Sequence, residues 1–196
     1  MKLQRQATYA GLEKALALNL TRSIGVSNFD SSQLQEILET ATVPPAVNQC
    51  SMHVGGQVGG GSGHDDATIE FCQAHGIVYE AYSPLGGDDL GGKSVLSYPE
   101  LTQIAKSHSS TNFSWTAAQV AMQWVLQQGM TLVTATDNAA YMDADLQLEA
   151  SGGMALRLTK QEMELLSNIS AQPPSATRLI AGKPQARRDS DLSFIL

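Results

Sequence analysis

Short apolar runs alternate along the chain with longer stretches whose apolar positions recur at helical spacing. The predicted strands are residues 22–26, 46–50, 77–82 and 130–134, each a short run with apolar or β-branched residues. The predicted helices are residues 30–41, 66–74, 99–108, 116–127, 141–148 and 159–168. The pattern is therefore that of a strand followed by a helix, repeated four times.

Local signals mark where several of these helices begin and end. Asp30 followed by Gln33, and Thr159 followed by Glu162, have the spacing of capping boxes. Gly76 follows the helix predicted over residues 66–74, in the position that favours a left-handed C-cap.

Repeated strand–helix units predict an α/β fold of parallel (βα) units, with functional groups at the carboxyl ends of the strands. A closed barrel of such units needs eight strands and typically about 250 residues. Only four strands are predicted in residues 1–170, which we interpret as one domain forming half of a TIM barrel. Residues 171–196 contain three prolines and no periodicity, and are predicted to be a flexible tail.

Charge and composition argue against some classes of binding partner. The chain carries 12 Lys and Arg against 19 Asp and Glu, a formal net charge of −7, which argues against nucleic-acid binding. No apolar run approaches the roughly 18–20 residues that span a membrane, and charged residues interrupt the N-terminal stretch where a signal peptide needs its apolar core. Two cysteines are compatible with a reducing compartment. A cytoplasmic protein without a membrane partner is expected.

Polar and aromatic side chains fall at the ends of the first three predicted strands. Ser27 and Asn28 follow the first strand, Gln49 lies at the end of the second, and Tyr82 at the end of the third. Amides pair with a carboxamide, and a tyrosine ring stacks on a flat ring system. Together these groups predict a site for a flat, polar heteroaromatic ligand. Ser27 and Asn28 also suit an alternative role as helix caps.

Four stretches strongly resemble the C-terminal half of the aldo-keto reductases. They are RSIGVSNFD, PPAVNQCSMH, HGIVYEAYSPLG and AAQVAMQWVLQQG, and the resemblance covers about residues 9–169 in order. Members of that family are TIM-barrel oxidoreductases that reduce aldehydes and ketones with NADPH and sometimes NADH. The resemblance implies NADP(H) or NAD(H) as cofactor and a small carbonyl compound as substrate.

The resemblance also implies roles for individual residues. Ser27, Asn28 and Gln49 would hold the nicotinamide carboxamide, and Tyr82 would stack on the nicotinamide ring. Ser83, Leu85 and Gly86 would lie along the pyrophosphate. No metal is implied.

The chain departs from the family pattern at its reactive and phosphate ends. The family's proton-donating Asp, Tyr, Lys and His come from the first four strands and have no counterpart here, so no catalytic residue is assigned and the chain alone is expected to be inactive. Ala135 and Thr136 stand where many members have Lys-Ser, and Tyr141 stands where an arginine is common. Thr136 remains a candidate cofactor contact, and the preference between NADPH and NADH is open. Ser51 replaces a usual glutamate.

Two other motifs compete with this interpretation. Residues 87–94 match the P-loop pattern G-x-x-x-x-G-K-[ST], but Pro99 interrupts a helix opening at Ser94, and Asp88 and Asp89 would repel a phosphate. The residues His53, His64, Asp65 and Asp66 lack the spacing of a metal site. We interpret both segments as loops, and Cys50 and Cys72 as small buried residues.

The sequence thus favours an aldo-keto reductase-type oxidoreductase that carries the cofactor-binding half. One alternative is a non-catalytic half-barrel that binds a partner, with a homodimer through the open sheet edges as one form. The other alternative is a nucleotide-binding protein that uses residues 87–94.

Overall fold

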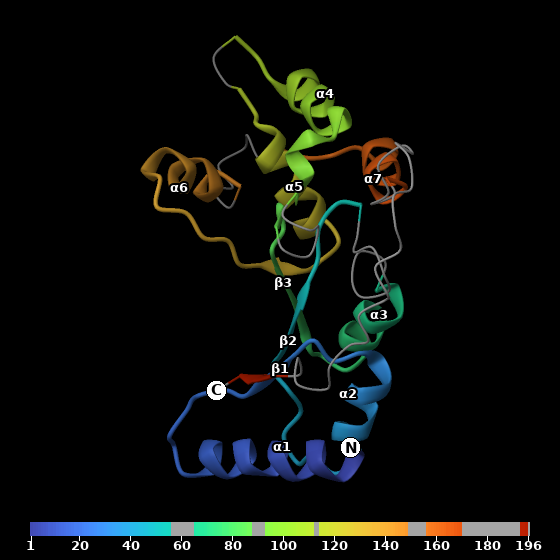
Figure 1. The fold of residues 1–196 in the computed structure, drawn as a ribbon, viewed down its shortest axis with the longest axis vertical. Coiled ribbons are helices and arrows are strands. Elements are labelled where there is room, and N and C mark those ends of the chain that lie inside the picture. The colour runs from blue at the N-terminus through green and yellow to red at the C-terminus, as the bar shows by residue number, and fades with distance from the viewer. Residues whose placement is uncertain (56–64, 88–92, 112–113, 149–155, 170–192, 196) are drawn as a thin grey trace, which may run out of the picture. The chain divides into compact units, whose positions relative to one another are not determined.

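The computed structural model describes residues 1–55, 65–87, 93–111, 114–148, 156–169 and 193–195 (Figure 1). The chain divides into two compact units. The first comprises Met1–Cys50, Asp65–Glu80 and Lys183–Leu196, and the second comprises Ser51–His64 and Ala81–Gly182. The division crosses two strands, so the same strands contribute residues to both units.

The first unit combines three helices with strands of the main sheet. Its elements are α1 (Lys2–Ala17), β1 (Gly25–Ser27), α2 (Ser31–Leu38), most of β2 (Val47–Ser51), α3 (Asp66–Ala74), the first half of β3 (Val78–Tyr82), and β7 (Ser193–Ile195). Strand and helix alternate here as the hydrophobic pattern predicts.

The main sheet has the strand order β6-β3-β2-β1-β7. β1 and β2 are parallel, with Val26 opposite Asn48 and Ser27 opposite Gln49. The Val78 amide donates to the Ala46 carbonyl, and the Met52 amide donates to the Tyr82 carbonyl, so β2 and β3 advance in the same direction. Successive strands of the βα units are thus neighbours, which confirms the predicted α/β fold with parallel strands.

α2 begins at the predicted capping box. The Gln33 amide donates to Asp30 Oδ1 over 2.9 Å, and the Asp30 amide donates to Gln33 Oε1 over 3.0 Å. Leu34 and Ile37 then lie on one face of the helix and are fully buried. A local polar motif therefore sets where the helix starts and which face it buries.

Replacing Asp30 by alanine is expected to lower the free energy of unfolding by about 1 kcal/mol, because the Gln33 amide loses its acceptor. Chemical denaturation followed by circular dichroism measures the change. Asp30→Ser is the control, since a serine hydroxyl accepts the same hydrogen bond and preserves most of the stability. An equal loss in both variants would contradict a capping role.

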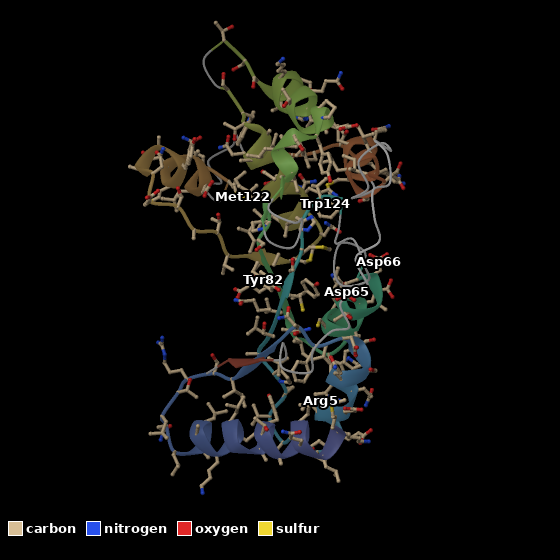
Figure 2. All side chains as sticks on the ribbon, in the orientation of Figure 1. Arg5, Asp65, Asp66, Tyr82, Met122 and Trp124 are labelled. Atoms are coloured by element: carbon tan, nitrogen blue, oxygen red, sulfur yellow. The ribbon has the colours of Figure 1, made fainter. Side chains whose placement is uncertain are left out.

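α1 is a helix that the sequence analysis did not predict. Tyr9 is buried against the rest of the unit, and its hydroxyl donates to the Val43 carbonyl over 3.0 Å. Arg5 extends from the same helix (Figure 2), and its Nε donates to Glu36 Oε2 of α2 over 3.0 Å. The apolar residues of α1 form no clear helical stripe, so the sequence pattern does not reveal this helix. Contacts with residues distant in the sequence stabilise it instead.

The second unit is mainly helical. It contains the end of β3, β4 (Gly86–Gly87), β5 (Lys93–Ser94), a 3-10 turn (Val95–Ser97), α4 (Pro99–His108), α5 (Ala117–Leu126), β6 (Thr131–Leu132), α6 (Ala139–Leu146) and α7 (Lys160–Ser167). α5 lies at its centre, with Val120, Met122 and Trp124 all buried.

Polar contacts link the helices of the second unit. His108 Nε2 of α4 lies 2.9 Å from Glu162 Oε1 of α7. The Glu162 carboxylate also accepts from the Thr159 amide over 2.7 Å, which closes the predicted capping box of α7. Burial opposes ionisation of Glu162, but hydrogen bonds from Thr159 and His108 outweigh it and hold the pKa of this carboxyl below its ordinary value.

The structure differs from the predicted elements at both ends of the strand series. The fourth predicted strand, residues 130–134, is reduced to Thr131–Leu132. Residues 193–195 of the predicted tail form β7, which pairs antiparallel with β1. Residues 170–192 and Leu196 lie outside the described residues, so the flexible tail stays a prediction. Pairing with β7 gives the outer edge of β1 its backbone partners.

Membrane insertion finds no support in the helices described. Within the ranges given above, none combines the length and hydropathy of a transmembrane segment.

Candidate functional site

Two residues directly after β1 and β3 adopt left-handed backbone conformations. Asn28 has φ +61° and Ser83 has φ +53°, and neither is a glycine. Such conformations are sparsely populated for L-residues and cluster at ligand-binding sites, where the surrounding structure compensates their strain. Both lie at carboxyl ends of parallel strands, where the sequence predicts the site.

In the first unit, Ser27 and Asn28 are fixed to the same backbone carbonyl. The Ser27 hydroxyl donates to the Gln49 carbonyl over 2.9 Å, and the Asn28 amide donates to the same oxygen, also over 2.9 Å. Ser27 is the last residue of β1 rather than the residue after it, and is almost fully buried. The structure thus brings the predicted residues Ser27, Asn28 and Gln49 together at the end of β1.

Asn48, on the opposite face of β2 from Gln49, supports the turn formed by Asn28 and Phe29. Its Nδ2 donates to the Phe29 carbonyl over 2.8 Å, and its Oδ1 accepts from the Phe29 amide over 3.3 Å. Asn48 is fully buried, and these hydrogen bonds satisfy the polar atoms of its side chain inside the unit. Its role is to hold the Asn28–Phe29 turn, while its neighbour Gln49 is left on the other face.

Glu80 is a member of the same group that the sequence analysis missed. Gln49 Nε2 donates to Glu80 Oε1 over 2.6 Å, from β2 to the adjacent strand β3. Residues of a strand alternate between faces, which places Glu80 on the face of Tyr82 rather than that of Tyr79. This alternation in the segment VYEAY was the available signal.

In the second unit, Tyr82 ends β3 and is half-buried (Figure 2). A tight turn follows, in which the Gly86 amide donates to the Ser83 carbonyl over 2.9 Å. Gly86 has φ +85°, a conformation that favours glycine. The predicted residues Ser83, Leu85 and Gly86 therefore share one turn, and each is half-buried.

The backbone around this turn argues against the alternative of a P-loop at residues 87–94. Gly86 pairs with Ser94 and Gly87 pairs with Lys93, so both ends of the motif form an antiparallel hairpin. Ser94 Oγ donates to the Leu85 carbonyl and accepts from the Leu96 amide, each over 3.2 Å, at the start of a 3-10 turn. An α-helix follows only at Pro99. Residues 88–92 lie outside the described residues, but the flanking backbone lacks the strand–loop–helix order of a phosphate-binding P-loop.

Thr136 lies between β6 and α6 in the second unit. Its Oγ1 accepts from the Asn138 amide over 3.1 Å, and Asn138 Oδ1 in turn accepts from the Ala140 amide at the start of α6. Ala135 is exposed, and the Tyr141 side chain is 63% exposed. Ala135 and Tyr141 therefore supply no positive charge here, and Asp137, an exposed residue between them, is acidic.

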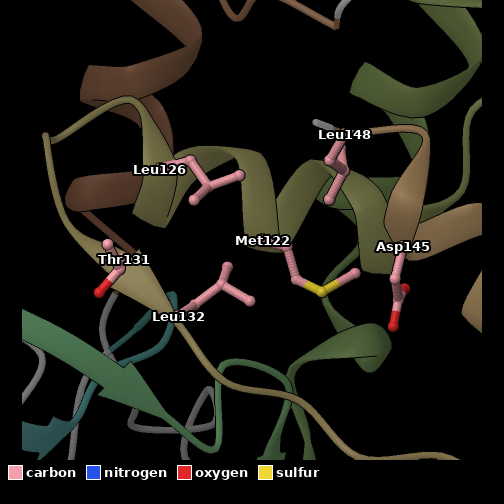
Figure 3. A pocket seen from close by; sticks show the side chains of 6 residues that line it. All are labelled: Met122, Leu126, Thr131, Leu132, Asp145 and Leu148. Atoms are coloured by element: carbon pink, nitrogen blue, oxygen red, sulfur yellow. The ribbon is translucent and has the colours of Figure 1, made fainter. Parts of the chain in front are cut away.

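The second unit contains a small pocket that none of the candidate site residues lines. It has a volume of about 110 Å³ and is lined by Met122, Leu126, Thr131, Leu132, Asp145 and Leu148 (Figure 3). Burial raises the pKa of the Asp145 carboxyl. Sites for drug-sized ligands occupy about 300–1,000 Å³, so this pocket does not accommodate a dinucleotide.

Cys50, Cys72 and Tyr79 lie in buried surroundings. Cys50 and Cys72 are buried and unpaired, as predicted, and burial raises the pKa of Cys50 to about 12 and of Cys72 to about 11. Burial likewise raises the pKa of Tyr79, whose hydroxyl lies 3.4 Å from Asp65 Oδ2. His64 is outside the described residues; among the described ones, no three His, Cys, Asp or Glu side chains form a group that could hold a metal.

Known proteins resemble this chain over most of its length. Residues 2–171 match the model of the aldo/keto reductase family. The chain is 35% identical to the NADPH-dependent codeinone reductase 1-2 of Papaver somniferum over 171 residues, covering 86% of this chain and 48% of that protein. It is 34% identical to the D-galacturonate reductase of Fragaria ananassa, covering 85% and 48% respectively.

The fold has a solved counterpart as well. The aldose reductase from Schistosoma japonicum superposes with a TM-score of 0.68 and 27% identity, covering 86% of this chain and 48% of that one. The parallel βα units are thus part of a TIM barrel, as predicted, and the chain spans about half the length of the relatives it matches. With 170 of its 196 residues matched, the chain belongs to the aldo/keto reductase family.

Proposed function

We propose that this chain carries the cofactor-binding half of an NAD(P)H-dependent reductase that converts an aldehyde or ketone to an alcohol. The observation that carries the proposal is the arrangement of Ser27, Asn28 and Gln49. Ser27 at the end of β1 and Asn28 directly after it both donate to the Gln49 carbonyl of β2, and Asn28 has a left-handed backbone conformation. Family membership, and a relative described as NADPH-dependent, support the same interpretation.

The hydrogen-bonding groups at the end of β1 support the proposal of a nicotinamide site. Ser27, Asn28 and Gln49 would hold its carboxamide through hydrogen bonds, and the half-buried Tyr82 would stack on its ring. Ser83, Leu85 and Gly86 would line the pyrophosphate, and Thr136 would donate to a phosphate oxygen. When bound, the nicotinamide supplies the hydride. The chain's own residues bind and orient that group.

The proton of the reaction has no source among the residues we assign. Reduction of a carbonyl develops negative charge on oxygen, and a positioned acid accelerates the reaction by stabilising that charge. The family's Asp, Tyr, Lys and His have no match in the 196 residues, and Tyr79 is bound to Asp65 within the first unit. We therefore expect this chain alone to bind dinucleotide weakly and to show no carbonyl reduction.

Discrimination between NADPH and NADH is expected to be slight. A cation on the 2′-phosphate contributes about 1.5–3 kcal/mol through a charge-assisted hydrogen bond, and Ala135 and Tyr141 supply none. A small carbonyl compound is the proposed substrate, and we propose a cytoplasmic protein without nucleic-acid or membrane partners. A homodimer through the sheet edges stays a prediction, and at the β1 edge it would require β7 to be displaced.

Cofactor titration of the purified chain tests the proposal. NADPH and NADH are expected to bind with similar, weak affinities in isothermal titration calorimetry. Tyr82→Ala is expected to weaken binding about threefold to tenfold because the stacking surface is lost. Tyr82→Phe is the matched control and preserves binding, since it keeps the ring.

Two results would contradict the proposal. Absence of binding by either dinucleotide would remove the cofactor-binding function and favour the alternative of a partner-binding half-barrel. Robust reduction of a panel of aldehydes by the chain alone would show that an acid is present in these residues.

A further inference from the structure

We propose that Glu80 is a positioning residue that fixes the orientation of the Gln49 carboxamide, so that the site selects a ligand bearing a primary carboxamide. This inference rests on the proposed function, because it concerns the residues that would hold the nicotinamide. It adds a residue and a direction of hydrogen bonding that the family resemblance does not supply.

The contact between Gln49 and Glu80 determines which end of the Gln49 amide faces the carboxylate. Gln49 Nε2 lies 2.6 Å from Glu80 Oε1. An ionised carboxylate accepts hydrogen bonds and donates none, so only the amide nitrogen of Gln49 can face it. The carbonyl oxygen of the side chain, Oε1, is thereby turned away from Glu80. Within the described residues, this is the hydrogen bond that the Gln49 side chain makes.

Ser27 has its direction of hydrogen bonding fixed in the same way. Its hydroxyl proton is donated to the backbone carbonyl of Gln49 over 2.9 Å, because a carbonyl oxygen can only accept. The lone pairs of Ser27 Oγ remain for an incoming donor. Ser27 and Gln49 are paired residues in the register of β1 and β2. Two neighbouring side chains therefore offer acceptors: Ser27 Oγ and Gln49 Oε1.

A primary carboxamide matches this pair of acceptors. Its nitrogen carries two N–H groups, whereas an acetyl or ester group in the same position carries none. A ligand without the N–H groups would leave the acceptors without partners in a partly desolvated site. The orientation set by Glu80 thus converts a general polar contact into selection for –CONH2.

A contribution to the stability of the fold does not explain why a glutamate occupies position 80. The side chain is half-buried, and within the described part of the chain no lysine or arginine forms an ion pair with it. Taking a carboxylate out of water without a cation is unfavourable. A charge placed beside Gln49 is more readily explained by the direction it imposes on the amide.

Glu80→Gln is the discriminating variant. Glutamine keeps the size of Glu80 but both donates and accepts, so the Gln49 amide can pair with it in either orientation. Glu80→Asp keeps an acceptor-only carboxylate on a shorter side chain. Glu36→Gln is the matched control, since it neutralises a carboxylate of the same unit that is bound to Arg5 instead.

The probes are NADP⁺ and its 3-acetylpyridine analogue, which has a methyl group in place of the carboxamide nitrogen. Dissociation constants are measured by following backbone amide shifts in ¹H–¹⁵N NMR titrations, which remain accurate for weak binding. The wild-type chain is expected to prefer NADP⁺ about fivefold to tenfold, the effect of one or two unmade hydrogen bonds. Glu80→Gln should bring this ratio close to one, Glu80→Asp should restore part of it, and Glu36→Gln should leave it unchanged.

The side-chain amide signals of Gln49, assigned with a Gln49→Glu variant, report its orientation directly. They should shift in Glu80→Gln and stay in place in Glu36→Gln. If the wild type distinguishes the two dinucleotides and Glu80→Gln does so equally well, the role of Glu80 is wrong while the proposed function stands. If neither dinucleotide binds the wild type, the proposed function fails and the inference fails with it.

Discussion

Replacing Trp124 by alanine is expected to lower the free energy of unfolding by about 3–5 kcal/mol, a large part of the stability of a small unit. Trp124 lies in α5 at the centre of the second unit (Figure 2) and is 1% exposed. Its Nε1 also donates to Ser167 Oγ of α7 over 3.1 Å. The substitution leaves a cavity and removes this hydrogen bond between α5 and α7.

Urea denaturation followed by far-ultraviolet circular dichroism measures this loss, since tryptophan fluorescence changes with the substitution itself. Ser167→Ala separates the hydrogen bond from the packing and is expected to cost only about 1 kcal/mol. A Trp124→Ala chain that unfolds within about 1 kcal/mol of the wild type would show that α5 is not the core of this unit.

Replacing Gly25 by alanine is expected to destabilise the first unit by about 2 kcal/mol or more, because β1 and β2 approach too closely for a side chain there. A Cβ atom on Gly25 would lie 2.5 Å from Val47 Cγ1 and 2.8 Å from the Val47 carbonyl oxygen. The second contact is with backbone, so relief requires the strands to move apart. That movement separates Ser27 from Gln49, and dinucleotide binding should weaken together with stability.

Gly11→Ala is the matched control for this substitution. Gly11 lies in α1, and a Cβ atom there would meet nothing within 4 Å. Alanine is favoured over glycine in a helix by about 0.5–1 kcal/mol, so this variant should be slightly more stable than the wild type. Equal stability of Gly25→Ala and the wild type, measured by chemical denaturation, would contradict the close approach of β1 to β2.

The residues of the proposed site lie where strands end, and this explains why destabilising β1 should affect binding. The Ser27 hydroxyl and the Asn28 amide both donate to the Gln49 carbonyl, which links the end of β1 to β2. Their positions depend on the register of β1 against β2, which Gly25 permits. Stability and dinucleotide binding are therefore expected to fall together in Gly25→Ala.

Elements defined by residues close in sequence could be predicted without the structure. The capping boxes that start α2 and α7 join residues only three positions apart, and α3 and α4 have the predicted boundaries. The short strands were predicted to within a few residues, except that β6 is shorter. Helix α1 and strand β7 were missed, because α1 depends on Val43 and Glu36 and β7 depends on β1.

The sequence by itself determined the order of the parallel βα units, the family, and the identity of the polar residues at the strand ends. These follow from residue types and spacings, which are local properties. Tertiary structure decided how those residues act. The Ser27 hydroxyl is committed to a carbonyl 22 positions away, and Gln49 is turned by a carboxylate 31 positions away. Only the pairing of strands brings such groups within hydrogen-bond distance, so the direction of each bond cannot be obtained from the sequence alone.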